Sequence, residues 1–292
     1  YKRQDASPEP IQEICEKYRK KLNLKYHRFP ENMGSISLVD QWSRCIELTS
    51  EPWLWIFSDD DMLEEGCVNA FFSALQKTNR EFELYRFNTS VIDENSHVTK
   101  ICPPHPLVES GIEFLYHRLC RNRESFISEY IFSRRIYKQK EGLVSFPLAW
   151  CSDDASWINF ADKKGIFTIY GPKVYWRKSN VNISSVSSKT RLHKIKACVE
   201  YFKWLEDYFN SKLLKDKLII QKDIIYELQT KWLYLQIKGQ APLDFHTIIF
   251  ILKNDDFSVL GNTVKRLTKL LAINFSYIKT YILNLFVNNF KA

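Results

Sequence analysis

The chain has 292 residues, of which 45% are apolar and 15% aromatic, and this composition predicts a sizeable buried core rather than a disordered protein. Its 8 glycines and 10 prolines argue against a fibrous or low-complexity protein, and the sequence shows no internal repeat. The net charge of +8 favours an anionic partner, such as a nucleotide phosphate, a nucleic acid or an acidic membrane surface, without choosing among them.

The seven cysteines are scattered along the chain, and none belongs to a C-x-x-C pair. An odd number of dispersed thiols is typical of a reducing compartment and argues against a disulfide framework or a structural zinc site. The sequence shows no signal peptide and no apolar run of the roughly 20 residues that a membrane-spanning helix needs. We therefore expect a cytoplasmic protein, either soluble or peripheral on the inner face of the cell membrane.

Helical and strand patterns alternate over residues 1–183, which predicts an α/β domain. The expected helices cover 11–22, 37–48, 66–76, 108–119 and 155–163, and the expected strands cover 24–29, 53–57, 82–91 and 165–174. Asp5-Ala6-Ser7-Pro8 supplies cap-type residues ahead of the first helix. The apolar run 53–57 lacks alternation, which suits a central parallel strand covered on both faces.

Residues 184–292 carry helical patterns alone, with apolar stripes within 192–209, 224–235 and 264–285. We expect a helical C-terminal region there. Its last stripe lies among lysines and arginines, which suits an anionic membrane surface. Packing against the first domain or against a second copy of the chain would give the same pattern.

Three consecutive aspartates, Asp59, Asp60 and Asp61, follow the apolar run 53–57. In open α/β sheets ligands bind beyond the carboxyl ends of strands, so this position suits a binding site. Adjacent carboxylates repel one another, and a divalent cation such as Mg²⁺ or Mn²⁺ would relieve the repulsion. The alternative is a solvated acidic turn in which Asp59 or Asp61 caps the next helix.

A second acidic cluster, Asp153-Asp154, lies at another boundary between elements. A carboxylate near a phosphate-binding site can act as general base for an incoming hydroxyl group. Trp150 and Trp157 flank the pair and are suited to stacking on a sugar ring. The alternative is an ordinary helix N-cap.

Five motifs follow one another along residues 1–185. They are Asp5-Ala6-Ser7-Pro8, Arg28 with Glu31-Asn32-x-Gly34, Phe57-Ser58-Asp59-Asp60-Asp61, Asp153-Asp154, and Trp176-Arg177 with Ser179 and Ile183-Ser184. In this order they resemble the DDxS turn, the R…EN-x-G loop, the DXD element, the acidic ED pair and the R…S-x-S segment of family 2 glycosyltransferases of bacterial polysaccharide and lipopolysaccharide biosynthesis. Gln4 stands where that family has the first aspartate of the DDxS turn.

The resemblance implies a GT-A-type, Rossmann-like fold and an inverting glycosyltransferase. Its donor would be a nucleotide diphosphate sugar, preferably a UDP-sugar, bound with Mn²⁺ or Mg²⁺, and its acceptor a hydroxyl of a glycan or a lipid-linked molecule. The residues that it assigns to the donor are Asp5, Arg28, Asn32, Asp59 and Arg177, with Asp60, Asp61 and Asp59 as metal ligands. Asp60 is the first choice because Ser58 replaces the family's leading aspartate. Asp154, beside Asp153, would be the catalytic base.

In the family, a strand, a helix and a second strand precede the DDxS turn, so the resemblance predicts an N-terminally truncated GT-A sheet. One rival interpretation is a non-catalytic nucleotide- or carbohydrate-binding relative. Another is a metal-dependent nuclease or nucleotidyltransferase, which would interleave basic and aromatic residues along one face. The basic residues here are dispersed, so we expect no nucleic-acid partner. Arg118, Arg121 and Arg123 either face a phosphate or form a solvated helix end.

Overall fold

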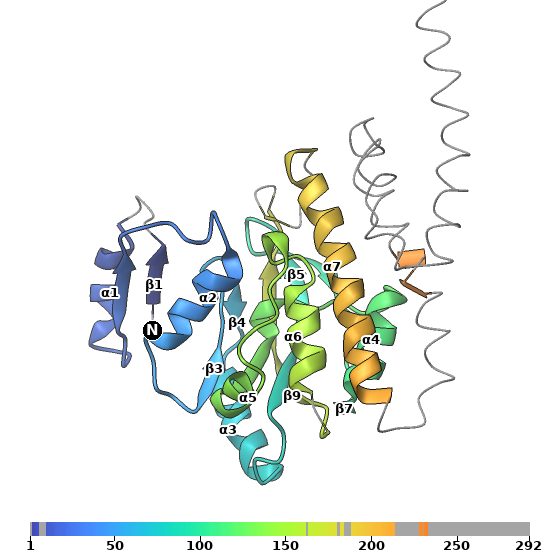
Figure 1. The fold of residues 1–292 in the computed structure, drawn as a ribbon. Coiled ribbons are helices and arrows are strands. Elements are labelled where there is room, and N and C mark those ends of the chain that lie inside the picture. The colour runs from blue at the N-terminus through green and yellow to red at the C-terminus, as the bar shows by residue number, and fades with distance from the viewer. Residues whose placement is uncertain are drawn as a thin grey trace, which may run out of the picture. The chain divides into compact units, whose positions relative to one another are not determined.

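A computed structural model describes residues 2–5, 10–161, 163–179, 182–183, 188–213, 228–229 and 231–232. The chain divides into two compact units, residues 1–185 and 186–292. The first unit contains two β-sheets and their helices (Figure 1). All seven cysteines are free thiols, as the sequence predicted.

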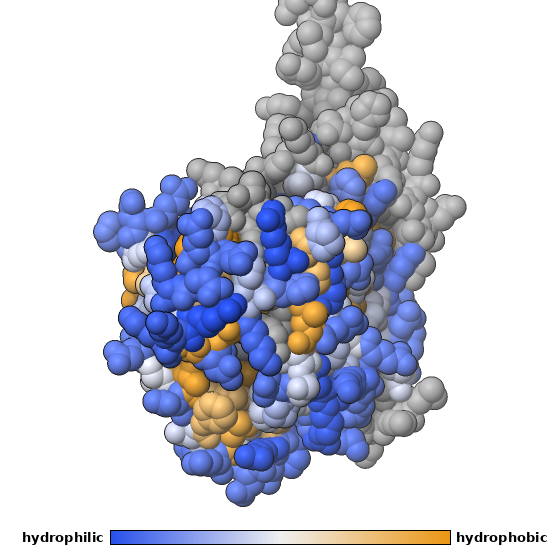
Figure 2. All heavy atoms as spheres, turned by 90° about the vertical axis from the view of Figure 1, so that its left-hand side faces the viewer, coloured by the Kyte–Doolittle hydropathy of each residue, from blue (hydrophilic) through white to orange (hydrophobic). Residues whose placement is uncertain are grey.

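A small parallel sheet opens the first unit. It pairs β1 (Lys2–Asp5) with β2 (Tyr26–Phe29), and α1 (Ile11–Arg19) connects the two strands. β1 was not predicted, and α1 begins after Pro10 without a side-chain cap, so the expected capping by residues 5–8 is wrong. Residues 6–9 lie outside the described part of the chain. α1 leaves Ile14 exposed. Figure 2 shows separate apolar patches in a mainly hydrophilic surface.

The larger sheet has seven strands in the order β3-β8-β5-β9-β4, with β6 beside β5 and β7 beside β9. Its strands are β3 (Trp53–Trp55), β4 (Met62–Leu63), β5 (Leu84–Ile92), β6 (Val98–Ile101), β7 (Val108–Glu109), β8 (Tyr130–Ser133) and β9 (Ile166–Arg177). Only β5 and β9 run parallel, and every other pair is antiparallel.

The prediction that residues 53–57 form a central parallel strand is wrong. β3 pairs with β8 alone among the described strands, in antiparallel register, and ends the strand order. Its continuous apolar character has another cause, because its indoles pack on aromatic rings of the core. The Trp53 ring meets Phe71 edge to face with the ring centroids 5.5 Å apart, and the Trp55 ring stacks on Phe87 at 5.4 Å.

The helices of the first unit follow their predicted patterns, with shifted ends. They are α1, α2 (Leu38–Glu47), α3 (Cys67–Lys77), α4 (Gly111–Leu119) and α6 (Ser152–Phe160). Sequence analysis missed the short helix α5 (Arg134–Gln139) and the 3₁₀ helix η1 (Ile127–Glu129). Ser110 and Glu113 form a capping box at α4, which starts that helix three residues later than expected.

In the second unit, α7 (Ser188–Leu213) contains the first predicted stripe, 192–209. The stripes at 224–235 and 264–285 lie outside the described residues, apart from four positions between 228 and 232. No helix within the described ranges is both long and apolar enough to cross a membrane.

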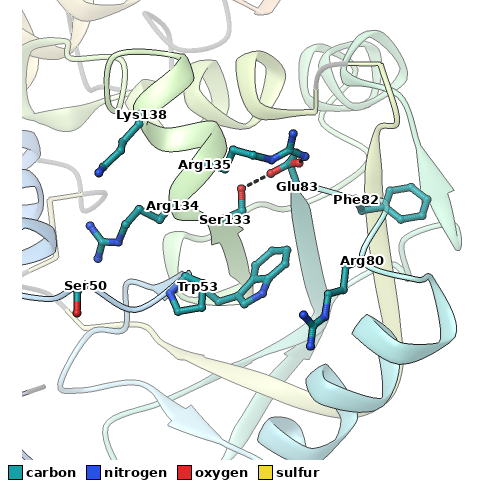
Figure 3. Close-up of a pocket in the computed structure, with 10 residues that line it drawn as sticks. Ser50, Trp53, Arg80, Phe82, Glu83, Ser133, Arg134, Arg135 and Lys138 are labelled. Carbon is teal, nitrogen blue, oxygen red and sulfur yellow. Dashed lines mark hydrogen bonds and ion pairs between the residues drawn. The ribbon is translucent and has the colours of Figure 1, made fainter.

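A pocket of about 500 Å³ opens at the edge of the larger sheet where β3 begins and β8 ends (Figure 3). The three aspartates 59–61 lie beyond the other end of β3. The pocket therefore lies at the start of β3, and the acidic turn lies beyond the end of the same strand.

Candidate active site

The first acidic cluster occupies the turn between β3 and β4. Asp59 and Asp60 are exposed, whereas Asp61 is buried. Asp61 accepts a hydrogen bond from the Ser128 hydroxyl at 2.6 Å and another from the Arg177 backbone N–H at 2.8 Å. Burial raises the pKa of Asp61, and these two hydrogen bonds oppose the rise. Asp61 therefore anchors the turn, and Asp59 and Asp60 are left facing solvent.

The side chain of Arg177, at the end of β9, also hydrogen-bonds to this turn. Its Nε donates to the Asp60 carbonyl oxygen at 2.7 Å. Its Nη1 donates to the Asp93 and Glu94 carbonyl oxygens at 2.6 and 3.1 Å, and Nη2 donates to the Ser96 hydroxyl at 3.0 Å. All of these acceptors are neutral, and the positive charge of Arg177 acts on the Asp61 carboxylate of the turn, whose pKa it lowers.

The second acidic cluster lies in the first turn of α6. The helix is preceded by Cys151, so Asp153 and Asp154 are inside it and the N-cap interpretation is wrong. Asp154 is only 4% exposed, and Asp153 is partly exposed. Leu148, Ala149 and Cys151 all have positive φ angles, a conformation that costs non-glycine residues free energy and is frequent at functional sites.

Arg118 of α4 orients the second cluster. Its Nε donates to both carboxylate oxygens of Asp154, at 3.0 and 2.9 Å. Burial raises the pKa of Asp154, and Arg118 opposes that rise. Burial and the neighbouring Asp154 raise the pKa of Asp153 to about 7. The pKa values of both carboxyls are therefore raised, and the two titrations are coupled.

A single short segment, residues 125–129, connects the two clusters, and we call it the linking segment. Its Ser128 binds Asp61, as described above. Its Ser125 hydroxyl shares a hydrogen bond with the Tyr130 hydroxyl at 3.0 Å and also acts on the Asp154 carboxyl, whose pKa it lowers. The clusters, far apart in the sequence, are thus held by two serines three residues apart. Sequence reasoning missed both serines, because no local pattern marks them.

The expected sugar-stacking role of Trp157 is wrong. Its indole is fully buried and stacks on Tyr130 with ring centroids 4.5 Å apart, so it belongs to the core. Trp150 is partly exposed. A second, unpredicted aromatic pair lies beside the linking segment, where partly exposed Phe126 stacks on partly exposed Trp176 at 4.5 Å and 18°.

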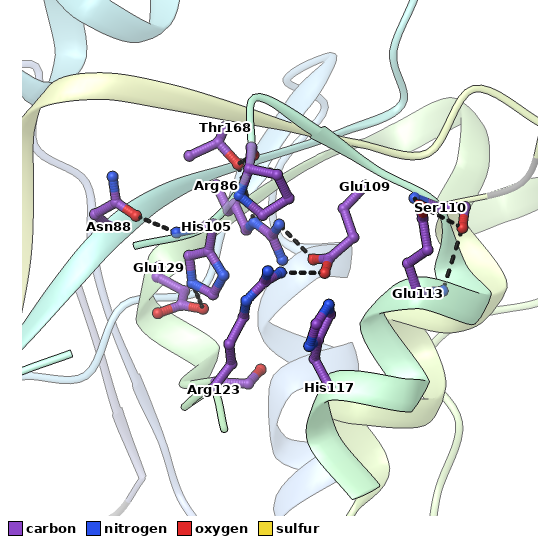
Figure 4. Close-up of polar contacts among 12 residues, drawn as sticks. Arg86, Asn88, His105, Glu109, Ser110, Glu113, His117, Arg123, Glu129 and Thr168 are labelled. Atoms are coloured by element: carbon purple, nitrogen blue, oxygen red, sulfur yellow. Dashed lines mark hydrogen bonds and ion pairs between the residues drawn. The ribbon is translucent and has the colours of Figure 1, made fainter. Parts of the chain in front are cut away.

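A buried ion network supports the second cluster (Figure 4). Arg118 donates to the Arg123 carbonyl oxygen at 2.8 Å, and the Arg123 guanidinium pairs with Glu109. Glu109 also accepts from Arg86 at 2.5 Å, and both of these side chains are almost fully buried. Arg118 and Arg123 thus bind carboxylates, and neither predicted role, phosphate contact or solvated helix end, describes them. Arg121 is exposed.

The residues expected to contact the nucleotide lie on the small sheet and its following turn. Asp5 ends β1, and its backbone pairs with Phe29 next to Arg28. Asn32 is exposed, and its side-chain oxygen accepts from the Ser35 N–H at 2.9 Å. The structure therefore places Asp5 and Arg28 at diagonal positions on neighbouring strands of the small sheet, whereas the acidic turn joins two strands of the larger sheet. The motif residues outside the described part of the chain are Ala6, Ser7, Pro8 and Ser184.

The chemistry of the acidic turn fits a divalent cation that is only partly coordinated by protein. Within the described ranges, no three His, Cys, Asp or Glu side chains are grouped to hold a metal ion. Asp59 and Asp60 nevertheless offer exposed carboxylate oxygens beside the anchored Asp61. Mg²⁺ commonly takes one or two carboxylates and completes its shell with water and substrate phosphates.

No protein-family model matches this chain, and no curated protein matches it either. Among solved structures, residues 1–349 of TarS from S. aureus in complex with UDP-GlcNAc match 90% of this chain and 69% of that one, with 13% identity and a TM-score of 0.57. The structure of TarS from S. aureus matches 86% of this chain and 39% of that one, with 12% identity and a TM-score of 0.50. The likeness shows that the chain has a GT-A-type α/β fold with added helices.

Proposed function

We propose that this protein is an inverting, metal-dependent glycosyltransferase that uses a nucleotide diphosphate sugar. The observation that carries the proposal is the linking segment, which ties an exposed acidic turn to a buried carboxyl pair at one site. The fold is that of a protein solved with UDP-GlcNAc, which makes a UDP-sugar the preferred donor. The resemblance to family 2 enzymes of polysaccharide and lipopolysaccharide biosynthesis favours a glycan or lipid-linked acceptor.

The donor diphosphate would lie over the acidic turn. Asp60, with Asp59 beside it, would hold Mn²⁺ or Mg²⁺, and Asp61 would fix the turn in place. The cation would stabilise the negative charge that grows on the leaving diphosphate. Arg177 adds a positive charge at the same place. Asp5, Arg28 and Asn32, on and beside the small sheet, are proposed to contact the nucleotide.

Asp154 would act as the general base. Arg118 occupies one lone pair on each carboxylate oxygen of Asp154, and with Ser125 also acting on this carboxyl, at least one oxygen keeps a lone pair for an acceptor hydroxyl. Asp154 takes the hydroxyl proton as the hydroxyl oxygen bonds to the anomeric carbon. The bond from that carbon to the diphosphate breaks, and its electron pair leaves with the diphosphate. The charge of Asp153 would influence the pKa of Asp154. No covalent enzyme intermediate forms.

The test is a calorimetric titration of UDP and GDP, with and without Mn²⁺, into the protein and into Asp60→Ala, followed by a transfer assay with the corresponding sugar nucleotides. We expect Mn²⁺-dependent UDP binding that Asp60→Ala abolishes, and UDP release that requires Asp154. Binding without any turnover on glycan or lipid-linked acceptors would instead indicate the non-catalytic relative. Absence of binding under every condition would refute the proposal.

A further inference from the structure

The pocket where β3 begins and β8 ends has four cations among its ten lining residues. Arg80, Arg134, Arg135 and Lys138 contribute four positive charges, and Glu83 is the one carboxylate in the lining. Figure 3 shows Arg134 and Lys138 on one side of the Trp53 indole and Arg80 on the other.

The single carboxylate does not neutralise this charge. Glu83 pairs with Arg135, and its second oxygen accepts from the Ser133 hydroxyl. Arg134 donates to the neutral carbonyl oxygens of Glu51 and Ile46. Among the described residues, Arg80, Arg134 and Lys138 have no ion-pair partner. Convergence of these like charges in a concave site creates a positive potential that attracts an anion.

The position of the pocket separates it from the candidate active site. Glu83 directly precedes β5, and at the far end of that strand Ile92 pairs with Arg177, whose N–H binds Asp61. β5 has nine residues, so about 26 Å of strand lies between the two places at about 3.3 Å per residue. A ligand in the pocket is therefore not the donor diphosphate at the acidic turn.

The backbone that presents Arg80 is itself unusual. Asn79 and Arg80 have φ angles of 49° and 55°, a left-handed conformation that costs non-glycine residues roughly 1–2 kcal/mol each. The turn after α3 keeps this conformation and so directs the chain past the pocket mouth. Such strain is concentrated at ligand-binding positions in proteins.

We propose that this pocket binds a phosphorylated sugar. Guanidinium and ammonium groups are the preferred partners of phosphate, and arginine adds planar, two-pronged hydrogen bonding. The volume of about 500 Å³ exceeds that of a lone phosphate and lies within the range of small-molecule sites. Partly exposed Trp53 and Phe82 supply apolar surface for the sugar ring, while Arg80, Arg134 and Lys138 contact its phosphate.

Calorimetric titration of the full chain with glucose 6-phosphate, glucose and inorganic phosphate tests this proposal. We expect saturable binding of glucose 6-phosphate, tighter than binding of either fragment. The variant Arg80→Gln/Lys138→Gln should weaken it at least tenfold, since each charge-assisted contact contributes about 1.5 kcal/mol or more. The control Lys17→Gln/Lys20→Gln removes the same charge from exposed positions of α1 and its end, outside the pocket, and should change the affinity less than twofold.

Two further measurements separate loss of the ligand site from unfolding and from loss of the proposed transferase activity. Thermal unfolding should show that both double variants are folded, because the substituted side chains are exposed. Asp60→Ala should bind glucose 6-phosphate as the unmodified protein does, so the result is independent of the proposed transferase activity. The proposal is overturned by absence of binding, by equal loss in the control, by no loss in Arg80→Gln/Lys138→Gln, or by equal affinity for inorganic phosphate.

Discussion

The two acidic clusters contain the same residue type in opposite surroundings. In the turn 59–61, two aspartates face solvent and the third is held by a hydroxyl and a backbone N–H, both neutral. In the first turn of α6, Asp154 is buried and held by the charged Arg118, while Asp153 beside it is partly exposed. The first arrangement leaves negative charge available to a cation, and the second raises the pKa of both carboxyls, that of Asp153 to about 7.

This difference teaches that burial and partner, rather than residue type, divide the chemical roles. An exposed carboxylate presents its negative charge to solvent, where a metal ion can reach it. A buried one next to another carboxyl holds a proton more tightly and suits proton transfer. Four substitutions test this division, and each affects one cluster while the other serves as its reference.

The largest effect is expected for Asp154→Asn. Loss of the general base should lower kcat by about 10²- to 10⁴-fold, because the amide cannot take the acceptor proton. Steady-state transfer kinetics measure the rate, and retained Mn²⁺-dependent UDP binding shows that the first cluster and the fold are intact. A rate close to that of the unmodified protein would contradict the assignment of Asp154.

Asp60→Ala should weaken Mn²⁺-dependent UDP binding by about 10²-fold, with the same loss in the unmodified protein after removal of the metal by a chelator. Calorimetry measures both. Glu65→Ala is the matched control, because Glu65 is an exposed acid just after the same turn and the charge change is identical. Equal loss in the two variants would show that only the general charge of the region matters.

Asp61→Ala should destabilise the fold by about 2 kcal/mol, since it leaves the Ser128 hydroxyl and the backbone N–H of Arg177 without their acceptor. Asp61→Asn should cost much less, because an amide can accept from the N–H and donate to the serine. Urea unfolding compares the two variants. If Asp61→Asn instead abolished Mn²⁺ binding, Asp61 would be a metal ligand rather than the anchor of the turn.

The smallest effect concerns pH and Asp153. Because its pKa rises from 3.8 to about 7 on folding, the folded state binds more protons than the unfolded state between these values, and stability falls as pH rises through them. Asp153→Asn removes this loss. The variant should be more stable than the unmodified protein at pH 8 by about 1–2 kcal/mol, an amount reduced by the partial exposure of the side chain, and equally stable near pH 4. Urea unfolding at both pH values, with Glu65→Gln as control, measures the difference, and a pH-independent difference would contradict the raised pKa.

The parts of the fold that the sequence predicted are those with a local signature. The helical periods of α2, α3 and α4 and the apolar strand β5 are visible in single segments. Segment 130–139 was missed because β8 is defined by its pairing with β3 and β5, which lie far away in the chain. The direction of β3 was wrong for the same reason, since an apolar run does not say which strand lies beside it.

The residues of the candidate site were likewise predicted only where they have a local sequence signature. Its aspartates were found because they are adjacent in sequence and follow apolar elements. Arg118 was visible only as one of three nearby arginines, and nothing local shows that it is the one that turns toward Asp154. Ser125 and Ser128 carry no sequence signal, because only the folded chain places them against the two clusters.

The linking segment has a consequence for how the two clusters respond to ligands. Since Ser128 binds Asp61 and Ser125 acts on Asp154, we expect a cation bound at the turn and a proton bound at the α6 pair to be thermodynamically coupled. The coupling is reciprocal: if cation binding favours release of the proton, then raising the pH tightens cation binding by the same factor. Calorimetry of Mn²⁺ with UDP near pH 7, in buffers of different ionisation enthalpy, should therefore reveal net proton release. Binding of the donor with its cation would then favour the deprotonated form of the catalytic base.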